Sequence, residues 1–395
     1  MRLNESILTK EIKYLFQILY RNNNELMLVG GCIRDSIVGK KIADYDLATK
    51  YRPDQLTAIL DKHGIEYLNT GKKFGTITAI LGDKKFEITT LRRDLAPDGR
   101  HAMVEFTEDY REDAERRDFT FNALYCGPSL EVWDYFNGIR DLKKGLLRFI
   151  GDPEKRILED HLRILRFFRF YSGYCYFMDY RALAACKKHR DKIKKLSGER
   201  ITEEMRKLLE SNYPLKSLKT MERCGILQKI FDYKGKLDFN ALEIFYSLKF
   251  HLNFDYNYLF VLALLKNKNT LECNLKLTRK EKNYLDLILK NIPENLESPG
   301  EMKKLLFELG DAALTKTVAM ISLCSNFTPS YGECLDVLEK TKIPEFRLGG
   351  EDLLEHGFTN KREYGKFIKM ARDIFIKYDF KLNREEIIEI LKTKV

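Results

Sequence analysis

Several features that mark common functional classes are missing from this sequence of 395 residues. Its eight cysteines form no C-x-x-C pair, and no pair of cysteines has a histidine at zinc-site spacing, a pattern typical of reduced, buried thiols in a cytoplasmic protein. None of the six histidines is followed by aspartate, so the His-Asp metal cluster of HD-type phosphohydrolases is absent. No apolar run approaches the roughly 20 residues of a membrane-spanning helix, so we expect no association with a membrane.

Internal repeats and low-complexity linkers are also absent, so composition alone does not mark domain boundaries. The chain is longer than one ordinary domain, and we expect about two to four domains. With 44% apolar and 32% charged residues, it can bury cores and is not disordered. The net charge of +10 fits a polyanionic partner such as nucleic acid, although the same excess also fits a role in solubility.

Strand-like and helix-like patterns alternate over about the first 140 residues. Strands are predicted in ELMLVGG, ADYDLAT, GTITAIL and KFEITTL, the last two joined by the turn GDKK. Helices are predicted in CIRDSIVG and PDQLTAILDKHG, ending at Gly39 and Gly64. After Asp134 nearly every segment carries the helical period, including DPEKRILEDHLRILRFFRFYSGY, which we expect to be one long helix. The fold class is therefore α+β, a head with a small mixed sheet followed by an all-helical remainder.

Two aspartates one residue apart stand out in the segment ADYDLAT. On a strand, Asp44 and Asp46 lie on the same face, where their charges repel each other unless a cation lies between them. Oxygen ligands of this kind favour Mg²⁺, which takes phosphate oxygens as further ligands in phosphoryl and nucleotidyl transfer. Glu87 in FEITT is a candidate third ligand on a neighbouring strand. An isolated D-x-D is more often a solvated strand end, so the interpretation depends on the surrounding residues.

A glycine pair precedes the short helix before these aspartates. Gly30 and Gly31 would let backbone N–H groups approach a triphosphate, and the helix dipole favours the anion. Arg34 follows at a position that can reach the same phosphates, and Asp35 could hold its side chain or the helix start in place. These neighbours make the carboxylate pair a candidate nucleotide site.

A second group of polar residues lies in EDAERRDFTFNALY, where Arg116, Arg117 and Asp118 precede an apolar, helix-like run. Two adjacent arginines repel each other unless an anion joins them, so one of them is a candidate phosphate ligand. Asp118 can accept a hydrogen bond from a ribose hydroxyl or hold an arginine, and Asn122 adds neutral hydrogen-bonding groups. The alternative interpretation is the capped start of a surface helix.

The third group lies in RILEDHLRILRFFRF, which we expect to be helical throughout. Asp160 and Glu159 lie three and four residues before Arg163, and Arg166 follows one turn later, so the default interpretation is an ordinary salt bridge. A guanidinium donates hydrogen bonds and an ionised carboxylate accepts them. Together they match cytosine and adenine, which present a ring-nitrogen acceptor beside an amino donor, and they refuse uracil and guanine.

The three groups together resemble the class II tRNA nucleotidyltransferases, the CCA-adding enzymes, which share a polymerase-β-like head with bacterial poly(A) polymerases. The resemblance depends on GGCIRD with DYDLAT, on RRDFTFNAL and on EDHLRILR, and it covers about the first 170 residues densely. The segments SGERITEEMRKLL and LGGEDLLEHGFTNKREYGKFIKMARDIF resemble later family segments. The resemblance implies a catalytic head at 1–140, a helical neck at 141–220, a helical body at 221–295 and a tRNA-binding helical tail at 296–395.

The resemblance also implies a reaction, the template-independent addition of CCA to the 3′ end of tRNA from CTP and ATP, with release of pyrophosphate. Asp44 and Asp46 would bind Mg²⁺, and the base would be selected by Asp160 and Arg163, with Arg166 beside them. The residues implied for triphosphate and ribose are Gly30, Gly31, Arg34, Arg117, Asp118 and Asn122. In LRRDLAPDGRHAMVEF, the flexible loop of the family would use Arg92, Asp98 and Arg100 to help switch from C to A.

Three other functions stay open at this point. A poly(A) polymerase would share the head, but we expect such an enzyme to carry a long basic extension, which the segment REEIIEILKTKV does not resemble. An enzyme that adds only CC or only A is the second alternative, and the expected loop argues against the CC-only version. A catalytically inactive RNA-binding protein is the third, and the intact Asp44, Asp46, Asp118 and Arg163 argue against it.

Overall fold

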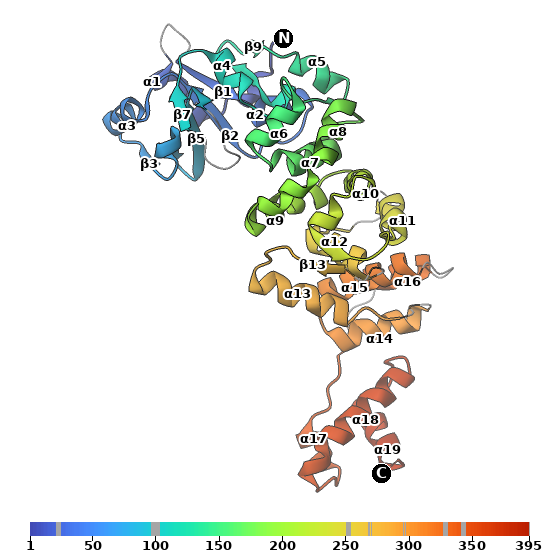
Figure 1. Cartoon of the computed structure of the whole chain (residues 1–395). Helices are drawn as coiled ribbons and strands as arrows, with labels where there is room; N and C mark the ends of the chain where they lie inside the picture. The colour runs from blue at the N-terminus through green and yellow to red at the C-terminus, as the bar shows by residue number, and fades with distance from the viewer. Residues whose placement is uncertain are drawn as a thin grey trace. The chain divides into compact units, whose positions relative to one another are not determined.

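The computed structural model describes residues 1–20, 25–95, 103–249, 254–267, 269, 271–294, 296, 298–326, 331–340 and 345–394 (Figure 1). The chain divides into two compact units. The first comprises Met1–Lys234 with Leu271–Lys276, and the second comprises Gly235–Thr270 with Leu277–Val395. The fold class expected from the sequence is confirmed, because a small mixed sheet occupies the N-terminal head and helices dominate the rest.

A seven-stranded sheet forms the centre of the head. Its strand order is β3-β4-β5-β2-β1-β8-β9, with β1 Leu26–Val29, β2 Tyr45–Thr49, β3 Glu66–Leu68, β4 Thr76–Leu81, β5 Lys84–Thr90, β8 Leu124–Cys126 and β9 Val132–Asp134. The β2–β5 pair is parallel and the other pairs are antiparallel. The four strands predicted from the alternating segments before residue 91 are therefore confirmed.

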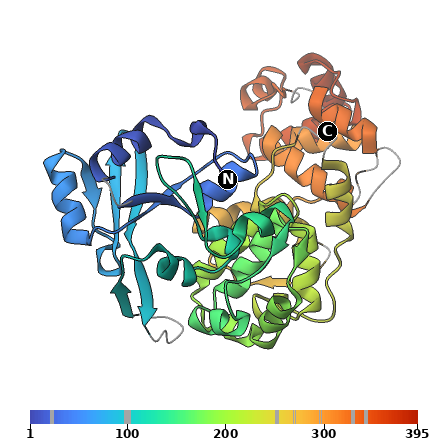
Figure 2. The ribbon, with the colours of Figure 1, turned by 90° about the horizontal axis from the view of Figure 1, so that it is seen from above.

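Both faces of the sheet are covered, which follows from the alternation of side chains along each strand. In β1, Leu26 and Leu28 pack into one core with α1 (Lys10–Leu19) and α3 (Pro53–Lys62). The intervening side chains of β1 belong to a second core, which includes residues of α4 (Tyr110–Glu115). In Figure 2 the blue and cyan strands lie between α3 and the green helices that follow the head. Every second side chain along a strand therefore faces the side of the sheet on which those helices lie.

The helices after the head are shorter than the sequence pattern suggests. The segment predicted to be one helix is split into α6 (Pro153–Glu159) and α7 (Arg163–Tyr174) by Asp160, whose backbone is extended at φ −147° and ψ 109°. The Asp160 carboxylate accepts a hydrogen bond from the Leu162 N–H at 3.0 Å, and such a local bond competes with helix formation. The prediction of one continuous helix through EDHLR is therefore wrong.

The first unit also contains the short helices α2 (Gly31–Ile37) and α5 (Gly138–Lys143), and after α7 it contains α8 (Tyr180–Lys188), α9 (Gly198–Leu209) and α10 (Pro214–Arg223). Both α9 and α10 pack against α7. Two short strand pairs depart from the all-helical expectation: β10 (Leu146–Leu147) with β11 (Phe177–Met178), and β12 (Phe231–Tyr233) with β13 (Leu271–Cys273).

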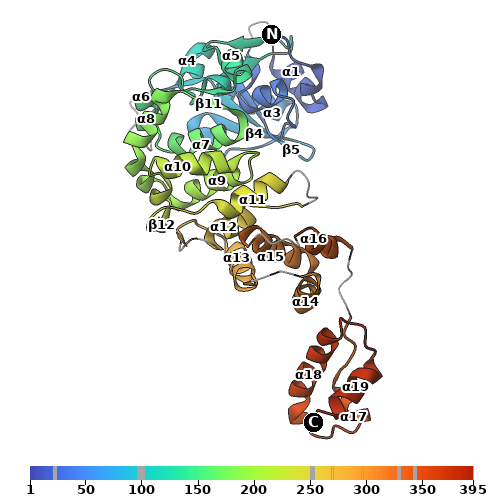
Figure 3. The same cartoon turned by 90° about the vertical axis from the view of Figure 1, so that its right-hand side faces the viewer.

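The second unit is helical over the residues that the structure describes. Its α-helices are α11 Asn240–Leu248, α12 Tyr258–Asn267, α13 Arg279–Lys290, α14 Pro299–Leu309, α15 Ala312–Ser325, α16 Tyr331–Lys340, α17 Gly350–Glu355, α18 Tyr364–Lys377 and α19 Arg384–Lys392. Figure 3 shows α17, α18 and α19 packed together, around an apolar cluster that includes Leu353, Phe367 and Ile387. Across the described parts of both units, no helix combines the length and apolarity needed to cross a bilayer. The finer division into head, neck, body and tail stays a prediction.

Candidate active site

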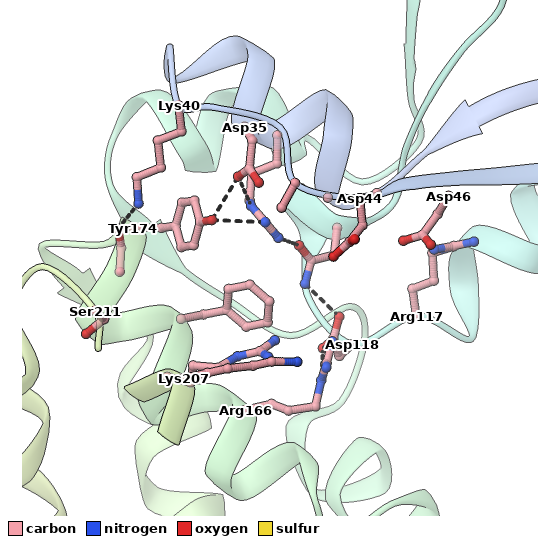
Figure 4. Close-up of a pocket in the computed structure, with 18 of the residues that line it drawn as sticks. Asp35, Lys40, Asp44, Asp46, Arg117, Asp118, Arg166, Tyr174, Lys207 and Ser211 are labelled. Carbon is pink, nitrogen blue, oxygen red and sulfur yellow. Dashed lines mark hydrogen bonds and ion pairs between the residues drawn. The ribbon is translucent and has the colours of Figure 1, made fainter. Parts of the chain in front are cut away.

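A pocket of about 740 Å³ lies within the first unit and gathers most of the predicted site residues (Figure 4). It is lined by the turn between β1 and α2 (Gly31–Ile37), the start of β2, the segment after α4, and parts of α7 and α9. The predicted residues that line it are Gly30, Gly31, Arg34, Asp44, Asp46, Arg117, Asp118, Asn122, Asp160, Arg163 and Arg166. Glu87 and Arg92 are not among its lining residues, and Asp98 and Arg100 lie outside the described part of the chain.

The side chains of Asp44 and Asp46 have no partner within the described residues. Asp46 is the second residue of β2, and Asp44 immediately precedes that strand. Neither carboxylate forms a hydrogen bond or an ion pair with any residue that the structure describes. Asp46 lies opposite Glu87 in the parallel β2–β5 pair. Within the described residues, no group of three or more His, Cys, Asp or Glu side chains is arranged to hold a metal ion, so a ligand role for Glu87 stays a prediction.

The electrostatic environment of Asp46 favours the arrival of a cation. Burial raises the pKa of its carboxyl, and the charges of Glu87 and Asp44 add to this rise, while Arg117 and Arg34 oppose it. The net shift is upward, which means that the ionised form is less favourable here than in water. Asp44 and Asp46 have no partner among the described residues, and the pKa of Asp46 is raised. Such a pair of carboxylates is a donor set that suits a hard divalent cation.

The turn between β1 and α2 brings the backbone close to polar groups of the second motif. Gly30 has φ +72°, a left-handed conformation that favours glycine. A Cβ at this position would lie 3.3 Å from the Asn122 carbonyl oxygen and 3.5 Å from Nη1 of Arg117. The Arg117 guanidinium therefore faces the glycine turn, at the start of helix α2. This is the arrangement that the glycine pair predicts for a phosphate site, with an arginine beside the turn.

Arg34 is buried and held by three side chains. Its Nε donates to Asp35 at 2.9 Å, its Nη1 to the Asn122 side-chain oxygen at 2.7 Å and its Nη2 to the Tyr174 hydroxyl at 3.0 Å. The Tyr174 hydroxyl in turn donates to Asp35 at 2.8 Å, and its ring lies 4.2 Å from the guanidinium. The prediction that Asp35 positions Arg34 is confirmed. Tyr174, at the end of α7, was not predicted, because nothing in its local sequence indicates this contact.

Asp113, which the sequence analysis did not single out, joins the two adjacent arginines. Its side chain is 1% exposed and lies 2.7 Å from Nη2 of Arg116 and 3.1 Å from Nη2 of Arg117. It also accepts a hydrogen bond from the Tyr125 hydroxyl at 2.6 Å. Burial alone would raise the pKa of Asp113, but the two guanidinium groups and Tyr125 hold it well below its ordinary value. The sequence contains a signal for this contact, because Asp113 stands three and four residues before the two arginines, a spacing typical of helical ion pairs.

Asp118 positions a third arginine. Its carboxylate lies 2.6 Å from Nη2 of Arg166 and accepts from the Asn122 amide at 3.0 Å. Burial would raise the pKa of Asp118, but Arg166, Asn122 and Arg163 lower it to about 2. The helix-like run predicted after Asp118 is wrong: Thr120–Asn122 form a 3-10 turn and strand β8 follows. The reason is tertiary, because β8 pairs with both β1 and β9 and completes the sheet.

Asp160 and Arg163 line the same pocket although they do not share a helix. Arg163 forms the predicted ordinary salt bridge with Glu159 at 2.7 Å and donates to two backbone carbonyls at 3.1 and 2.7 Å. These bonds use three of its five N–H donors. Asp160 pairs with Arg200, in the first turn of α9, at 3.1 Å. The pair therefore has an acceptor and remaining donors at the pocket, and its role in base selection stays a prediction.

A buried glutamate from α9 supports the arginines of α7. Glu204 lies 3.2 Å from Nε of Arg169 and 3.7 Å from Nη1 of Arg166. Both arginines line the pocket, whereas Glu204 does not. Sequence reasoning missed Glu204, because its partners lie on another helix and no spacing rule connects them.

The antiparallel pair of β6 (Arg92–Leu95) and β7 (Met103–Phe106) contains Arg92, the one of the three predicted loop residues that lies in the described part of the chain. The Arg92 N–H donates to the Asp113 carboxylate at 3.3 Å, and its guanidinium donates to the Phe74 carbonyl. The start of β6 is thus attached to the same carboxylate that holds Arg116 and Arg117. A role for Arg92 in switching from C to A stays a prediction.

Comparison with known sequences agrees with the family expected from the three motifs. Residues 26–148 match the poly A polymerase head domain, and residues 176–233 match a region described as a probable RNA and SrmB-binding site of polymerase A. The mitochondrial CCA tRNA nucleotidyltransferase 1 of Danio rerio is 32% identical over 98% of this chain and 91% of its own length. The CCA-adding enzyme of Lactobacillus helveticus is 28% identical over 89% of each chain.

Solved structures share the fold of the whole chain. The CCA-adding enzyme of Bacillus stearothermophilus, solved in complex with CTP, aligns with a TM-score of 0.73 at 22% identity over 98% of this chain and 99% of its own. The CCA-adding enzyme of Thermotoga maritima, solved with tRNA, gives a TM-score of 0.70 at 20% identity over 100% of this chain and 98% of its own. These likenesses show a common fold. Together with the Danio rerio relative, matched almost end to end, they establish that the chain belongs to the CCA tRNA nucleotidyltransferase family.

Proposed function

We propose that this chain adds C, C and A to the 3′ end of tRNA, using CTP and ATP and releasing pyrophosphate. The observation that carries the proposal is the pocket, whose lining combines arginines of α7 with two carboxylates that have no partner among the described residues. The family supports it, as do relatives solved with CTP and with tRNA. The match to a poly A polymerase head keeps that enzyme as the alternative, although relatives matched over nearly their whole length are named for CCA addition. A cytoplasmic location stays a prediction.

The cofactor of the proposed reaction is Mg²⁺, held by Asp44 and Asp46. Both carboxylates line the pocket without protein partners, and the raised pKa of Asp46 indicates a position that gains from a nearby cation. A bound Mg²⁺ would polarise phosphate oxygens and neutralise triphosphate charge during nucleotidyl transfer.

The chain's own residues would position the substrates. The 3′ hydroxyl of the RNA attacks the α-phosphorus of the nucleotide, and the bond to the departing pyrophosphate breaks. Arg117, beside the glycine turn, would bind the triphosphate, and Asp113 would keep its guanidinium aimed at that turn. Arg163 would donate to the base and Asp160 would accept from its amino group in exchange for Arg200. Arginines that are already held in position stabilise the charge that develops in the transition state without a further free-energy cost of reorganisation.

The experiment that tests the function uses three tRNAs, ending at the discriminator base, after C and after CC. Each is incubated with Mg²⁺ and with labelled CTP and ATP, separately and together. Products that stop at CCA on all three substrates support the proposal. Long A tails would assign the chain to the poly(A) polymerases, addition of A alone or of CC alone would assign a partial activity, and no incorporation would leave an RNA-binding protein.

A further inference from the structure

Three tyrosine rings surround one lysine beside the pocket, on a surface that the proposed reaction does not use. Nζ of Lys216 lies 4.5 Å from the ring centroid of Tyr171, 5.2 Å from that of Tyr213 and 5.6 Å from that of Tyr176. Tyr176 is 71% exposed and Tyr213 is 48% exposed. We call these four residues the tyrosine platform. Single exposed aromatic residues are ordinary, whereas exposed rings gathered beside polar groups are a candidate binding surface.

Hydrogen bonds hold the backbone of the two exposed tyrosines of the platform. The Tyr213 N–H donates to the Ser172 carbonyl at 3.2 Å, and the Tyr176 N–H donates to the Gly145 carbonyl at 2.8 Å. Gly145 has φ +62°, and a Cβ there would lie 2.6 Å from Cδ2 of Tyr176. A glycine at this position therefore leaves room for the ring. The backbone that carries the rings is held in place, while much of the surface of both side chains remains open to solvent.

Two lysines from other elements, Lys216 of α10 and Lys40 after α2, contact backbone carbonyls at the end of α7. Lys216 donates to the Cys175 carbonyl, and Lys40 donates to the Gly173 carbonyl at 2.7 Å. Lys40 also lies 3.8 Å from the ring centroid of Tyr174. Neither lysine forms an ion pair with a carboxylate in the part of the chain that the structure describes. Their charges are therefore available to an anionic partner.

The tyrosine platform is continuous with the pocket. Gly173 and Tyr174 line the pocket and lie between Tyr171 and Tyr176 in the chain. Ser211 and Asn212 also line it, immediately before Tyr213. Figure 4 shows Lys40, Tyr174 and Ser211 on the side of the pocket away from Asp46 and Arg117. A nucleic-acid strand that leaves the pocket on this side would pass the tyrosine platform.

We propose that the tyrosine platform binds the unpaired 3′ segment of the RNA acceptor, with bases stacked on Tyr176 and Tyr213 and phosphates beside Lys216 and Lys40. The inference rests on the proposed function, because that function supplies the RNA. Aromatic faces next to cations are how proteins hold single-stranded RNA without reading its sequence, since every base has a π face. This suits an enzyme whose acceptor end changes with each nucleotide added. A strand carrying one phosphate per base matches the spread of rings and lysines better than a single nucleotide does.

The test uses the double variant Tyr176→Ala/Tyr213→Ala, the conservative variant Tyr176→Phe/Tyr213→Phe, and Tyr14→Ala as a control for loss of a partly exposed tyrosine, 37% exposed on α1. The acceptor is a tRNA ending after the first C that carries 2-aminopurine at its unpaired discriminator position, one nucleotide before the reacting 3′ end, because stacking quenches the fluorescence of this base. The alanine variant should raise the KM for tRNA about 10-fold or more and abolish the quenching, while the KM for CTP and the kcat at saturating tRNA stay unchanged. The phenylalanine variant and Tyr14→Ala should behave as the wild-type protein.

Three results would overturn the inference. One is an unchanged KM for tRNA and unchanged quenching in the alanine variant. Another is an increase in the KM for CTP alone, which would assign the rings to the incoming nucleotide. The last is an equal loss in the phenylalanine variant, which would mean that the hydroxyls and not the ring faces matter. If the wild-type protein binds the RNA and quenches its 2-aminopurine fluorescence but adds no nucleotide, the proposed function is wrong while the inference about the tyrosine platform is supported.

Discussion

The acidic residues that line the pocket fall into two groups, which differ in how their charge is compensated. Asp44 and Asp46, at the start of β2, have no partner among the described residues. Asp35, Asp118 and Asp160 are each paired with an arginine. Because an uncompensated charge in a partly buried site is costly, a protein retains one where a ligand supplies the opposite charge. The comparison thus separates carboxylates kept for a ligand from carboxylates that position arginines.

Substitution of Asp46 tests the first half of this comparison and should have the largest effect on activity. Asp46→Asn keeps the size of the side chain but removes the charge that would hold Mg²⁺, so the single-turnover rate of C addition should fall about 1,000-fold or more. The free energy of unfolding should change by less than about 1 kcal/mol, because no internal ion pair is lost.

The matched control is Asp83→Asn, an exposed aspartate in the β4–β5 turn, which should leave both the rate and the stability unchanged. Denaturant unfolding and quench-flow incorporation measure the two quantities. A large loss of stability in Asp46→Asn would mean that its carboxylate has a structural partner, and the comparison would fail.

Substitution of Asp113 tests the second half. Asp113→Asn leaves Arg116 and Arg117 without their buried counter-ion, so the free energy of unfolding should fall by about 3 kcal/mol. The kcat/KM for CTP should fall about 10-fold, because Arg117 is no longer held toward the glycine turn. Glu115→Gln, at an exposed site on the same helix, is the control. If Asp113→Asn lost activity with no change in stability, the distinction between the two kinds of carboxylate would not hold.

Arg163→Ala should change the selection of the base more than the rate of nucleotide addition. Loss of its guanidinium removes charged hydrogen bonds to the base, so the ratio of kcat/KM for CTP over UTP should fall about 10-fold or more, and both C and A addition should weaken. The ratio is the informative quantity, because the variant also loses its bonds to Glu159 and two carbonyls and is destabilised. Strict selection of C and A by the variant would rule out a base-pairing role.

The pH dependence should show the smallest effect. Since the pKa of Asp46 is raised, protons begin to compete with Mg²⁺ at a higher pH than for an ordinary aspartate, whose pKa is about 3.9. The Mg²⁺ concentration for half-maximal activity should therefore rise several-fold as the pH falls from about 7 to about 5. A requirement that stays flat over this range would contradict the assignment of Asp46.

Much of the head could be predicted from local pattern. The apolar run in ELMLVGG and the alternation in ADYDLAT predicted the strands that the structure has as β1 and β2, and the glycine pair stands where Gly30 has a φ of +72°. The break in the helix at EDHLR could not be predicted, because it depends on the bond from the Leu162 N–H to Asp160, at which α6 ends early. The helical period before and after that break is intact, so hydrophobic pattern alone cannot reveal it.

The site shows the same limit in its contacts. The pairing of Asp113 with Arg116 and Arg117 follows an ordinary helical spacing and was available to sequence reasoning. The contacts of Tyr174 with Arg34 and of Glu204 with Arg169 join separate elements and depend on tertiary packing. Sequence therefore indicates which polar residues gather in the pocket more readily than which of them hold the others in place.

The most direct test of the central claim is a titration of Mg²⁺ into protein freed of divalent cations by a chelator, with tRNA and CTP present. The account predicts that the wild-type protein adds no nucleotide before Mg²⁺ is restored and then recovers with a saturable dependence. Asp46→Asn should bind tRNA equally well but stay about 1,000-fold slower at saturating Mg²⁺. Addition without any divalent cation, or full recovery of Asp46→Asn at the same Mg²⁺ concentration, would contradict the account.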